Sequence, residues 1–292
     1  MKYVALKDVC KINMGQSPDS SSYNENGEGI PFFQGNADFG ERYPVTRVWC
    51  NAPTKIAQSE DILISVRAPI GALNYAKEKC CIGRGLAAIT PDKSKVSLEF
   101  VYWFLKGKKA ELKSKGTGST FKAISKKILE EILIPDVGFD KQHEYAQMLE
   151  KIYVIIQTRK QELQKLDELI QSRFVELFGN PISNSYGLPE ATLPELGEFG
   201  RGVSKHRPRN DPRLLDGEYP LIQTGDIANT DLYITLYNST YSELGLQQSK
   251  MWNKGTLCIT IAANIAKTAI LGFDACFPDS VVGFNANERT NN

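Results

Sequence analysis

The chain contains one stretch of sequence twice. Residues 60–89 align without a gap with residues 255–284, at a constant offset of 195. Two weaker matches precede these segments in the same order: residues 6–15 with 193–202, and the turn around Gln34 with the turn around Gln223. Elements that recur in the same order indicate a duplicated domain, so the fold of the first copy is expected again in the second.

Each copy has the pattern of a β-rich domain. Short runs of β-branched and aromatic residues alternate with Gly, Pro, Asn and Asp, as in residues 61–71 and 256–261. Such runs predict strands joined by tight turns. Residues 97–115 differ and predict one helix, with an apolar face at helical spacing formed by Phe100, Val101, Phe104 and Leu105.

The segment between the two copies has a different character. Residues 141–178 contain no Gly and no Pro. Nine positions from Leu149 to Leu177 follow alternating spacings of three and four; two hold Arg159 and Arg173, and the other seven are apolar, as in the seam of a coiled coil: Leu149, Ile152, Ile156, Leu163, Leu166, Ile170 and Leu177. A helix of this length measures about 57 Å. It cannot bury the seam against itself, so we expect a partner helix.

The expected fold class is therefore α+β, with two β-rich domains joined by a long coiled-coil helix. We place the domains at residues 1–140 and 179–292, and the helix at residues 141–178. Gly179 and Pro181 mark the end of the helix, because a glycine often follows the last turn and a proline cannot continue it.

Charge is unevenly distributed along a nearly neutral chain. The net charge is +1. Residues 105–127 nevertheless hold eight lysines against one glutamate, and residues 201–213 hold five arginines and lysines against one aspartate. Basic clusters of this kind suit a polyanionic partner. A solvated helix face explains them equally well, so charge alone leaves both interpretations open.

Several classes of protein are disfavoured. No apolar run approaches the roughly 18 residues of a membrane helix, and the N-terminus lacks the apolar core of a signal peptide. We therefore expect a cytoplasmic protein without a membrane partner. The six cysteines form no Cys-x-x-Cys pair, and the chain has two histidines. We expect no metal site, and buried, reduced thiols.

Catalytic motifs are also missing from the sequence. An adenine methyltransferase would need an Asn- or Asp-Pro-Pro-aromatic motif, and the nearest match, at Asn180, lacks the second proline and the aromatic ring. No spaced carboxylates with a lysine suggest a magnesium-dependent nuclease. Two non-enzymatic interpretations remain: a reader that contacts two stretches of a long polymer, and a coiled-coil scaffold with duplicated β-rich modules that binds no DNA.

Four motifs resemble those of one family. They are residues 30–39 (IPFFQGNADF), 61–71 (DILISVRAPIG), 118–135 (GSTFKAISKKILEEILIP) and 173–199, which closes the long helix. The chain looks like the specificity subunit of Type I restriction-modification systems. The resemblance implies two target recognition domains, each reading one half of a bipartite site in double-stranded DNA, and long helices that separate them and dock the methyltransferase subunits.

The resemblance also implies a non-catalytic subunit without a cofactor of its own. In such systems the methyltransferase subunits transfer a methyl group from S-adenosylmethionine to adenine. A restriction subunit, which joins through the complex, uses ATP and magnesium to translocate and cut DNA. The implied partners are therefore DNA, the methyltransferase subunits and the restriction subunit.

Two features depart from the family pattern. Residues 134–146 match the motif usual at that place only at Ile134, Pro135 and Gln142. The second copy, counted at the same offset as the first, would extend roughly 80 residues beyond Asn292. We therefore expect a C-terminally shortened subunit, whose helix pairs with the same helix of a second copy in a two-fold dimer.

Two kinds of contact with DNA select the candidate binding residues. Phosphate contacts need lysines, hydroxyls and a close approach of the backbone, which residues 115–122 combine in Lys115, Thr117, Ser119, Thr120 and Lys122. Base contacts need arginine, asparagine or glutamine on exposed turns, which the first copy offers in Gln34, Asn36, Arg67 and Arg84.

The second copy differs at these positions. Ala262 aligns with Arg67, as two different half-sites would require. We expect Lys205, Arg207 and Arg209 to supply the basic contacts there. Ordinary alternatives stay open for each group: a polar loop for residues 115–122, ion pairs with nearby acids for the arginines of the first copy, and a solvated loop for the basic residues of the second.

Overall fold

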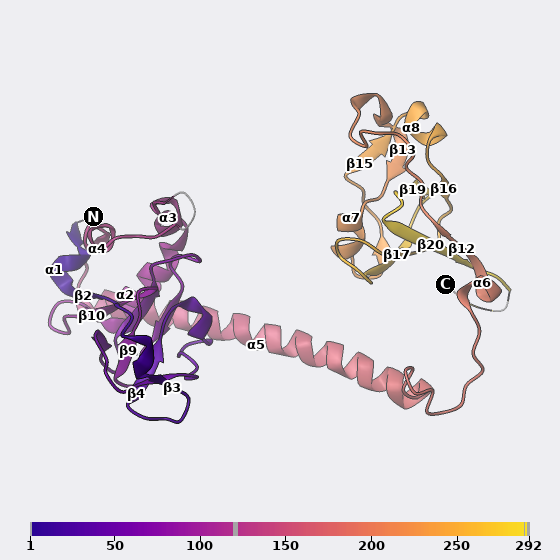
Figure 1. The fold of residues 1–292 in the computed structure, drawn as a ribbon. Coiled ribbons are helices and arrows are strands. Elements are labelled where there is room, and N and C mark those ends of the chain that lie inside the picture. The colour runs from indigo at the N-terminus through magenta and orange to yellow at the C-terminus, as the bar shows by residue number, and fades with distance from the viewer. Residues whose placement is uncertain (1, 119–121, 289, 291–292) are drawn as a thin grey trace. The chain divides into compact units, whose positions relative to one another are not determined.

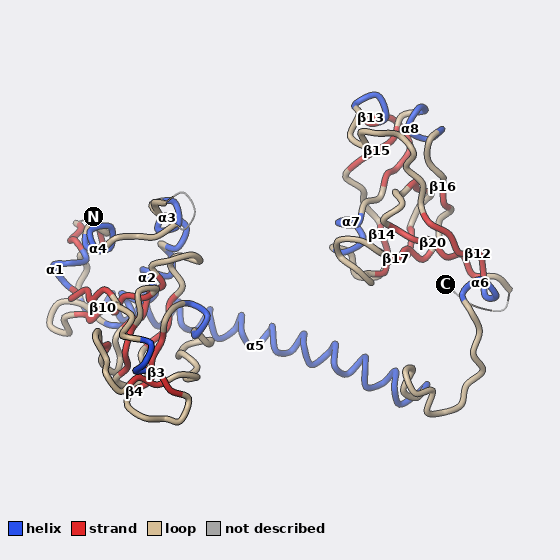
Figure 2. The backbone as a smooth tube through the Cα atoms, in the orientation of Figure 1, coloured by secondary structure: helices blue, strands red, loops and turns tan. Residues whose placement is uncertain are grey.

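The chain folds into two compact units, residues 1–171 and 172–292, in a computed structural model that describes residues 2–118, 122–288 and 290. Figure 1 shows the elements of each unit and Figure 2 their secondary structure. No helix among the described residues is long and apolar enough to cross a membrane. The α+β class expected from the sequence is confirmed.

The first unit is built on two packed sheets. One has the order β2-β10-β7-β8, all antiparallel, with bounds Cys10–Met14, Leu86–Pro91, Ile62–Ser65 and Leu73–Tyr75. The other has the order β3-β5-β4-β9-β6, in which β4 and β9 are parallel, with bounds Tyr23–Asn24, Trp49–Cys50, Ile30–Phe33, Cys80–Ile82 and Ile56–Ala57. A short pair, β1 (Tyr3–Ala5) with β11 (Leu133–Pro135), ties the N-terminus to the segment before the long helix.

Both faces of the first sheet are covered, so strand β7 is buried along its whole length. Ile62 and Ile64 pack in the cluster that contains the helix residues, and Leu63 packs on the opposite side with residues of the second sheet. A strand buried on both faces reads as a continuous apolar run rather than an alternating one. The short helices of this unit are α1 (Leu6–Val9), η1 (Ser20–Ser22), η2 (Asn36–Asp38), α2 (Leu98–Gly107), α3 (Lys109–Ser114) and α4 (Lys126–Glu130).

The single helix predicted over residues 97–115 is wrong in one respect. The structure has two helices there, α2 and α3, which meet at Lys108. Lys108 has φ −83° and ψ 1°, outside the helical range of ψ. Gly107 precedes it, and glycine is a poor helix former because it loses the most backbone freedom on folding.

Helix α5 (Phe139–Phe178) confirms the predicted long helix and begins two residues earlier, directly after Gly138. Its 40 residues correspond to about 60 Å, and Figure 1 shows it as one uninterrupted ribbon. Gly179 ends it with φ +77°, and its N–H donates to the carbonyl of Val175 at 2.8 Å. Such a left-handed glycine is a common helix terminator.

The second unit repeats this plan. One sheet has the order β12-β20-β17-β18-β14, with bounds Gly197–Arg201, Val281–Ala286, Leu257–Thr260, Thr268–Leu271 and Tyr233–Ile234. The other has the order β15-β13-β19-β16, with bounds Ser239–Tyr241, Leu215–Leu221, Ala275–Cys276 and Met251–Trp252. The short helices are α6 (Leu193–Leu196), η3 (Pro212–Leu214), α7 (Thr224–Ala228) and α8 (Glu243–Gln247).

The strand orders show that the repeated sequence is a repeated fold. The order β2-β10-β7-β8 recurs as β12-β20-β17-β18, and β5-β4-β9-β6 recurs as β15-β13-β19-β16. The parallel pairing recurs as well, because Phe32 pairs with Cys81 and Leu221 with Cys276. The units differ on the outer face of the first sheet, where the second unit leaves Ile259 half-buried.

All six cysteines are buried and free, which confirms the predicted thiols. Burial raises the pKa of Cys258 to about 12. Burial, and to a smaller extent the nearby carboxylate of Asp61, raises the pKa of Cys80 to about 12. A thiol with so high a pKa carries almost no reactive thiolate at neutral pH, so these side chains act as small core residues.

A close approach of two backbone segments recurs in both units. The N–H of Gly15 donates to the carbonyl of Leu86 at 2.9 Å, and that of Gly202 donates to the carbonyl of Val281 at 2.8 Å. A Cβ on Gly15 would lie 2.1 Å from the carbonyl oxygen of Gly83, far inside van der Waals contact. Glycine is required there because the neighbouring atom belongs to the backbone, which cannot swing away.

We predict that Gly15→Ala lowers the free energy of unfolding by about 1–3 kcal/mol, since the added methyl group forces the two segments apart. Urea denaturation of the full chain measures the change. Gly107→Ala is the matched control, because its Cβ would meet nothing within 4 Å. Equal stability of Gly15→Ala and the unchanged chain would contradict the close approach.

Candidate nucleic-acid interface

Four of the predicted base-contacting residues line one surface cavity of the first unit. This cavity, of about 540 Å³, is called the first depression here. Its lining comes from three segments far apart in the sequence: Gln34, Gly35, Asn36, Ala37 and Asp38 after β4; Arg67, Ala68 and Pro69 after β7; and Arg84 and Gly85 between β9 and β10. The structure therefore brings together Gln34, Asn36, Arg67 and Arg84.

Backbone hydrogen bonds hold the three segments together. The N–H of Gly85 donates to the carbonyl of Gln34 at 3.1 Å, and the N–H of Val66 donates to the carbonyl of Gly85 at 2.9 Å. A Cβ on Gly85 would lie 2.4 Å from the Gln34 carbonyl oxygen, so the approach again depends on glycine. The turn itself is closed by Asp38, whose Oδ2 accepts from the N–H of Gln34 at 2.7 Å.

The cationic and amide side chains of the first depression face outward. Gln34, Arg67 and Arg84 are exposed. Within the part of the chain that the structure describes, neither guanidinium forms an ion pair. The carboxylate of Asp38, which also lines the depression, instead accepts backbone N–H groups. Unpaired guanidinium groups keep all their donors available for an incoming acceptor.

The lysine-rich segment lies beside Arg67. The N–H and the carbonyl of Thr117 each bond to Ala123, at 3.0 and 2.9 Å. Ala123 also forms a β-bridge with Arg67, and the N–H of Ile124 donates to the carbonyl of Val66 at 2.9 Å. Thr117 and Lys122 are exposed at this place. Ser119 and Thr120, which the sequence analysis also proposed, lie outside the described residues.

Lys115 is engaged within the protein. Its Nζ lies 2.7 Å from Glu111, which also holds Lys108 at 2.6 Å. The hydrogen bonds from Lys108 and Lys115 lower the pKa of Glu111 to about 2. Lys115 is therefore held in a surface ion pair, whereas Lys122 stays the better candidate for a phosphate contact.

Comparison with known proteins shows the family of the chain. Residues 1–168 match the pattern of the Type I restriction modification DNA specificity domain. The chain belongs to this specificity family. The MjaX specificity subunit of a type I restriction enzyme from Methanocaldococcus jannaschii is 48% identical over 158 residues, which make up 54% of this chain and 37% of that subunit. A second curated relative from the same organism is aligned over 42% of its length, so this chain spans less than half of either.

Solved specificity subunits have the same architecture. The subunit from Thermoanaerobacter tengcongensis is 40% identical, with a TM-score of 0.51, over 59% of this chain and 44% of that chain. A Type I restriction-modification S subunit from M. genitalium matches 99% of this chain and 73% of its own, with a TM-score of 0.56 at 15% identity. The second similarity concerns the fold alone, and it extends through both units.

The three basic candidates of the second unit have different surroundings. Lys205 is exposed. Nη1 of Arg207 donates to the carbonyls of Ser204 and His206, at 2.7 and 2.8 Å. Nη2 of Arg209 lies 2.5 Å from a carboxylate oxygen of Asp279. Nη2 of Arg207 also lies 4.0 Å from Asp279, so both arginines pair with this acid, and Arg209 does so at the shorter distance.

The structure also shows a cluster that the sequence analysis missed, here called the helix clamp. It consists of Arg42, Trp103, Lys106, Glu150 and Tyr153. Nζ of Lys106 lies 4.0 Å from the ring centre of Tyr153 and 4.7 Å from that of Trp103. The guanidinium of Arg42 lies 5.0 Å from the same tyrosine ring and forms an ion pair with Glu150. These contacts fix the first turns of α5 on the first unit.

Electrostatics and ring packing both contribute to the helix clamp. Burial, and then repulsion by Arg42, lowers the pKa of Lys106. Cations over aromatic faces are attracted by the ring quadrupole, more strongly where water is partly excluded. The sequence contains one hint of the helix clamp: Tyr153 is an aromatic residue of the long helix, and it lies off the coiled-coil seam.

Gln142 anchors the helix about two turns before Glu150 and is 3% exposed. Its Oε1 accepts from the N–H of Ser97 at 2.8 Å, and its Nε2 donates to the carbonyl of Val137 at 2.8 Å. Ser97 caps α2, because its hydroxyl accepts from the N–H of Phe100 at 3.2 Å. One buried amide therefore joins the start of α5 to the start of α2.

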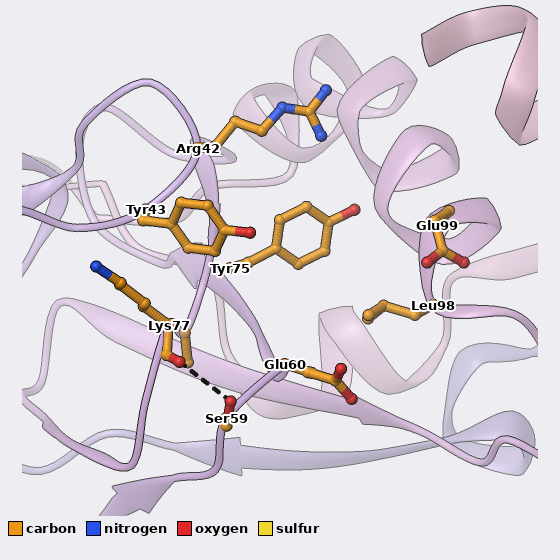
Figure 3. Close-up of a pocket in the computed structure, with 9 residues that line it drawn as sticks. Arg42, Tyr43, Ser59, Glu60, Tyr75, Lys77, Leu98 and Glu99 are labelled. Atoms are coloured by element: carbon orange, nitrogen blue, oxygen red, sulfur yellow. Dashed lines mark hydrogen bonds between the residues drawn. The ribbon is translucent and has the colours of Figure 1, made fainter.

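A second cavity of the first unit, shown in Figure 3, contains none of the predicted residues. Its volume is about 520 Å³. Tyr43 and Tyr75 lie side by side there, with Glu60 and Glu99 on the side away from Lys77. The mixture of both charge signs does not favour a polyanion. No group of three or more His, Cys, Asp or Glu among the described residues could hold a metal ion.

We predict that Gln142→Ala loosens the docking of α5, since it leaves the buried N–H of Ser97 and the carbonyl of Val137 without partners. Loss of this amide lowers the free energy of unfolding by about 1–3 kcal/mol. Amide hydrogen exchange should accelerate at the start of α2 and in the first turns of α5. Gln147→Ala, at an exposed position of the same helix, should leave exchange unchanged, and equal protection in both variants would contradict the anchor.

Proposed function

We propose that this chain binds double-stranded DNA in a sequence-specific manner, and that its first unit reads one part of a bipartite target through the first depression. The observation that carries the proposal is the meeting of Gln34, Asn36, Arg67 and Arg84 in one cavity. Three chain segments converge to present these side chains, and the exposure of Gln34, Arg67 and Arg84 leaves them accessible to a duplex, whereas Asn36 is half-buried.

The chemistry of these side chains suits base edges. Arginine pairs with the N7 and O6 acceptors of guanine, and glutamine or asparagine pairs with N7 and the N6 amino group of adenine. Lys122 and Thr117, beside Arg67, suit phosphate groups, which position a duplex without reading its sequence. A reading surface flanked by a phosphate-binding surface is the arrangement that sequence-specific binding requires.

The second unit is the proposed reader of the other half of the target. The support is its fold, which repeats four strands of each sheet of the first unit in the same order. The different side chains at equivalent positions, such as Ala262 for Arg67, suit a different base sequence.

Helix α5 is the proposed docking element. Its seam is exposed within the chain, with exposed fractions from 42% at Leu149 to 69% at Ile170. Met148, Ile155 and Leu169 form a second exposed apolar stripe beside the seam, at multiples of seven residues. A face this wide can contact more than one helix. We infer that the seam pairs with the same helix of a second copy, and that methyltransferase subunits dock along the helix.

The proposed subunit is non-catalytic and holds no cofactor of its own. S-adenosylmethionine belongs to the methyltransferase subunits in this proposal, and ATP with magnesium belongs to the restriction subunit. The alternative function is a coiled-coil scaffold with two β-rich modules that does not bind DNA. The exposed seam favours partner binding in either case, so DNA binding itself decides between the two.

We predict that Arg84→Ala and Lys122→Ala weaken DNA binding in different ways. Arg84→Ala should lower affinity for the selected sequence about tenfold and abolish the preference for one base pair. Lys122→Ala should weaken binding to all sequences and reduce the slope of affinity against salt concentration by about 1. Fluorescence anisotropy with duplexes selected from a random library measures both effects.

The control for these variants is Lys165→Ala, at an exposed position of α5 outside the seam. It should leave affinity and sequence preference unchanged. If the unaltered chain binds no duplex from the library above background, the scaffold function is correct and the DNA-reading function is wrong.

We predict that Ile170→Arg abolishes self-association through α5, because a charge at the seam would lack a partner in the buried interface. Sedimentation equilibrium should show a dimer for the unaltered chain and a monomer for the variant. Gln161→Arg adds the same charge on a different face of the helix and should leave the dimer intact. Dissociation of both variants to the same degree would argue against a seam-mediated dimer.

A further inference from the structure

The second unit has its own depression at the topologically equivalent place. Its volume is about 330 Å³, and its lining includes Gln223 and Ser280. These two residues occupy the places that Gln34 and Gly85 hold in the first depression. The two turns share one hydrogen bond, since Asp226 accepts from the N–H of Gln223 at 2.8 Å as Asp38 does from Gln34 at 2.7 Å, although the second turn is one residue shorter.

The charges around the two depressions are different. The residue equivalent to Arg84 is Asp279, at the same offset of 195 that relates the two copies. A cation nevertheless reaches this place, because Arg209 comes from the segment before η3 and lines the second depression. Its Nη2 lies 2.5 Å from Oδ1 of Asp279.

We propose that the second depression is a nucleobase-reading site, in which Arg209, held by Asp279, donates to the edge of a guanine. This inference rests on the proposed DNA binding and extends it to a second site with its own residues. The guanidinium replaces that of Arg84 in function, although it is supplied by a different part of the chain.

The surroundings of Arg209 favour it over its neighbours. The main chain at Asp279 is held in place, because Nε and Nη2 of Arg201 donate to its carbonyl at 3.1 and 2.7 Å. Nη1 of Arg207 donates to carbonyls of its own loop, its Nη2 lies 4.0 Å from Asp279, and Arg207 does not line the second depression. Lys205 does not line the depression. Arg209 is the candidate that combines a place in the cavity with a carboxylate to orient it.

Pairing with Asp279 does not prevent base reading. A guanidinium has five N–H donors, and the contact with Asp279 uses one nitrogen, Nη2. The remaining donors can address N7 and O6 of guanine together. A side chain already held in one orientation loses less conformational freedom on binding, which strengthens and sharpens recognition.

Selection of duplexes from a random library tests this inference, with the full chain compared with Arg209→Ala, Arg209→Lys, Asp279→Asn and Lys205→Ala. The unaltered chain should select a motif of two separated parts. Arg209→Ala should lose the guanine preference at one position of one part, with affinity about tenfold lower and the other part unchanged. Arg209→Lys should keep most of the affinity yet lose the preference, since an ammonium lacks the two-pronged geometry.

The other variants complete the test. Asp279→Asn should weaken the same guanine preference as Arg209→Ala, and Lys205→Ala should reduce affinity equally for all sequences. If Arg209→Ala and Arg209→Lys keep every base preference while Arg84→Ala still loses one, the second site is wrong and the proposed function stands. If the unaltered chain selects no motif at all, both are wrong.

Discussion

The docking of α5 on the first unit is the constraint on which the rest of the molecule depends. Only Gln142 and Ala146 are buried along this fully described helix, so its first turns must supply its attachment to the β-rich part of the unit. A buried amide and the helix clamp provide that attachment. Cation–aromatic contacts and a paired carboxylate are directional, so they fix the rotation of the helix as well as its position. The rotation decides which apolar stripe is left facing outward for partners.

Both units share a backbone arrangement, here called the frame, and differ in the side chains around their depressions, here called the rim. The frame is made by backbone contacts that recur at Gly15 and Gly202, and by the same strand order in each sheet. The rim carries the side chains that differ, with Arg84 in one unit and Asp279 with Arg209 in the other. Because glycine stands at the points of closest approach, the backbone contacts of the frame do not depend on which side chains form the rim. Such a division lets a reading surface change without disturbing the fold, because backbone hydrogen bonds do not depend on side-chain identity.

The sequence predicted the features that depend on local pattern. The long helix followed from the absence of Gly and Pro, and its end followed from Gly179. The duplicated fold followed from the fixed offset, and the buried thiols followed from the cysteine spacing. Gln34, Asn36, Arg67 and Arg84 follow from residue types that pair with base edges, on a turn, at the end of a strand or between two glycines. Their meeting in one cavity required the three-dimensional pairing of β4 with β9.

Features that depend on distant side chains could not be predicted in this way. The helix clamp joins Arg42, Lys106 and Tyr153, and no local pattern links residues so far apart. The distinction between Arg207 and Arg209 depends on their distances from Asp279, 4.0 and 2.5 Å, and on which of them lines the second depression, and Asp279 lies seventy residues from Arg209. The break at Lys108 was missed because apolar spacing continues across it, and the backbone of Lys108 departs from the helix all the same.

Photo-crosslinking tests most directly whether the first depression contacts DNA. A photoreactive amino acid would replace Gln34 in the first depression or Lys77 in the cavity of Figure 3. With a selected duplex, the reagent at position 34 should crosslink efficiently to one fixed base position, and the reagent at position 77 should not crosslink. Crosslinks from position 77 with none from position 34 would contradict a DNA-reading first depression and place the interface at the cavity of Figure 3.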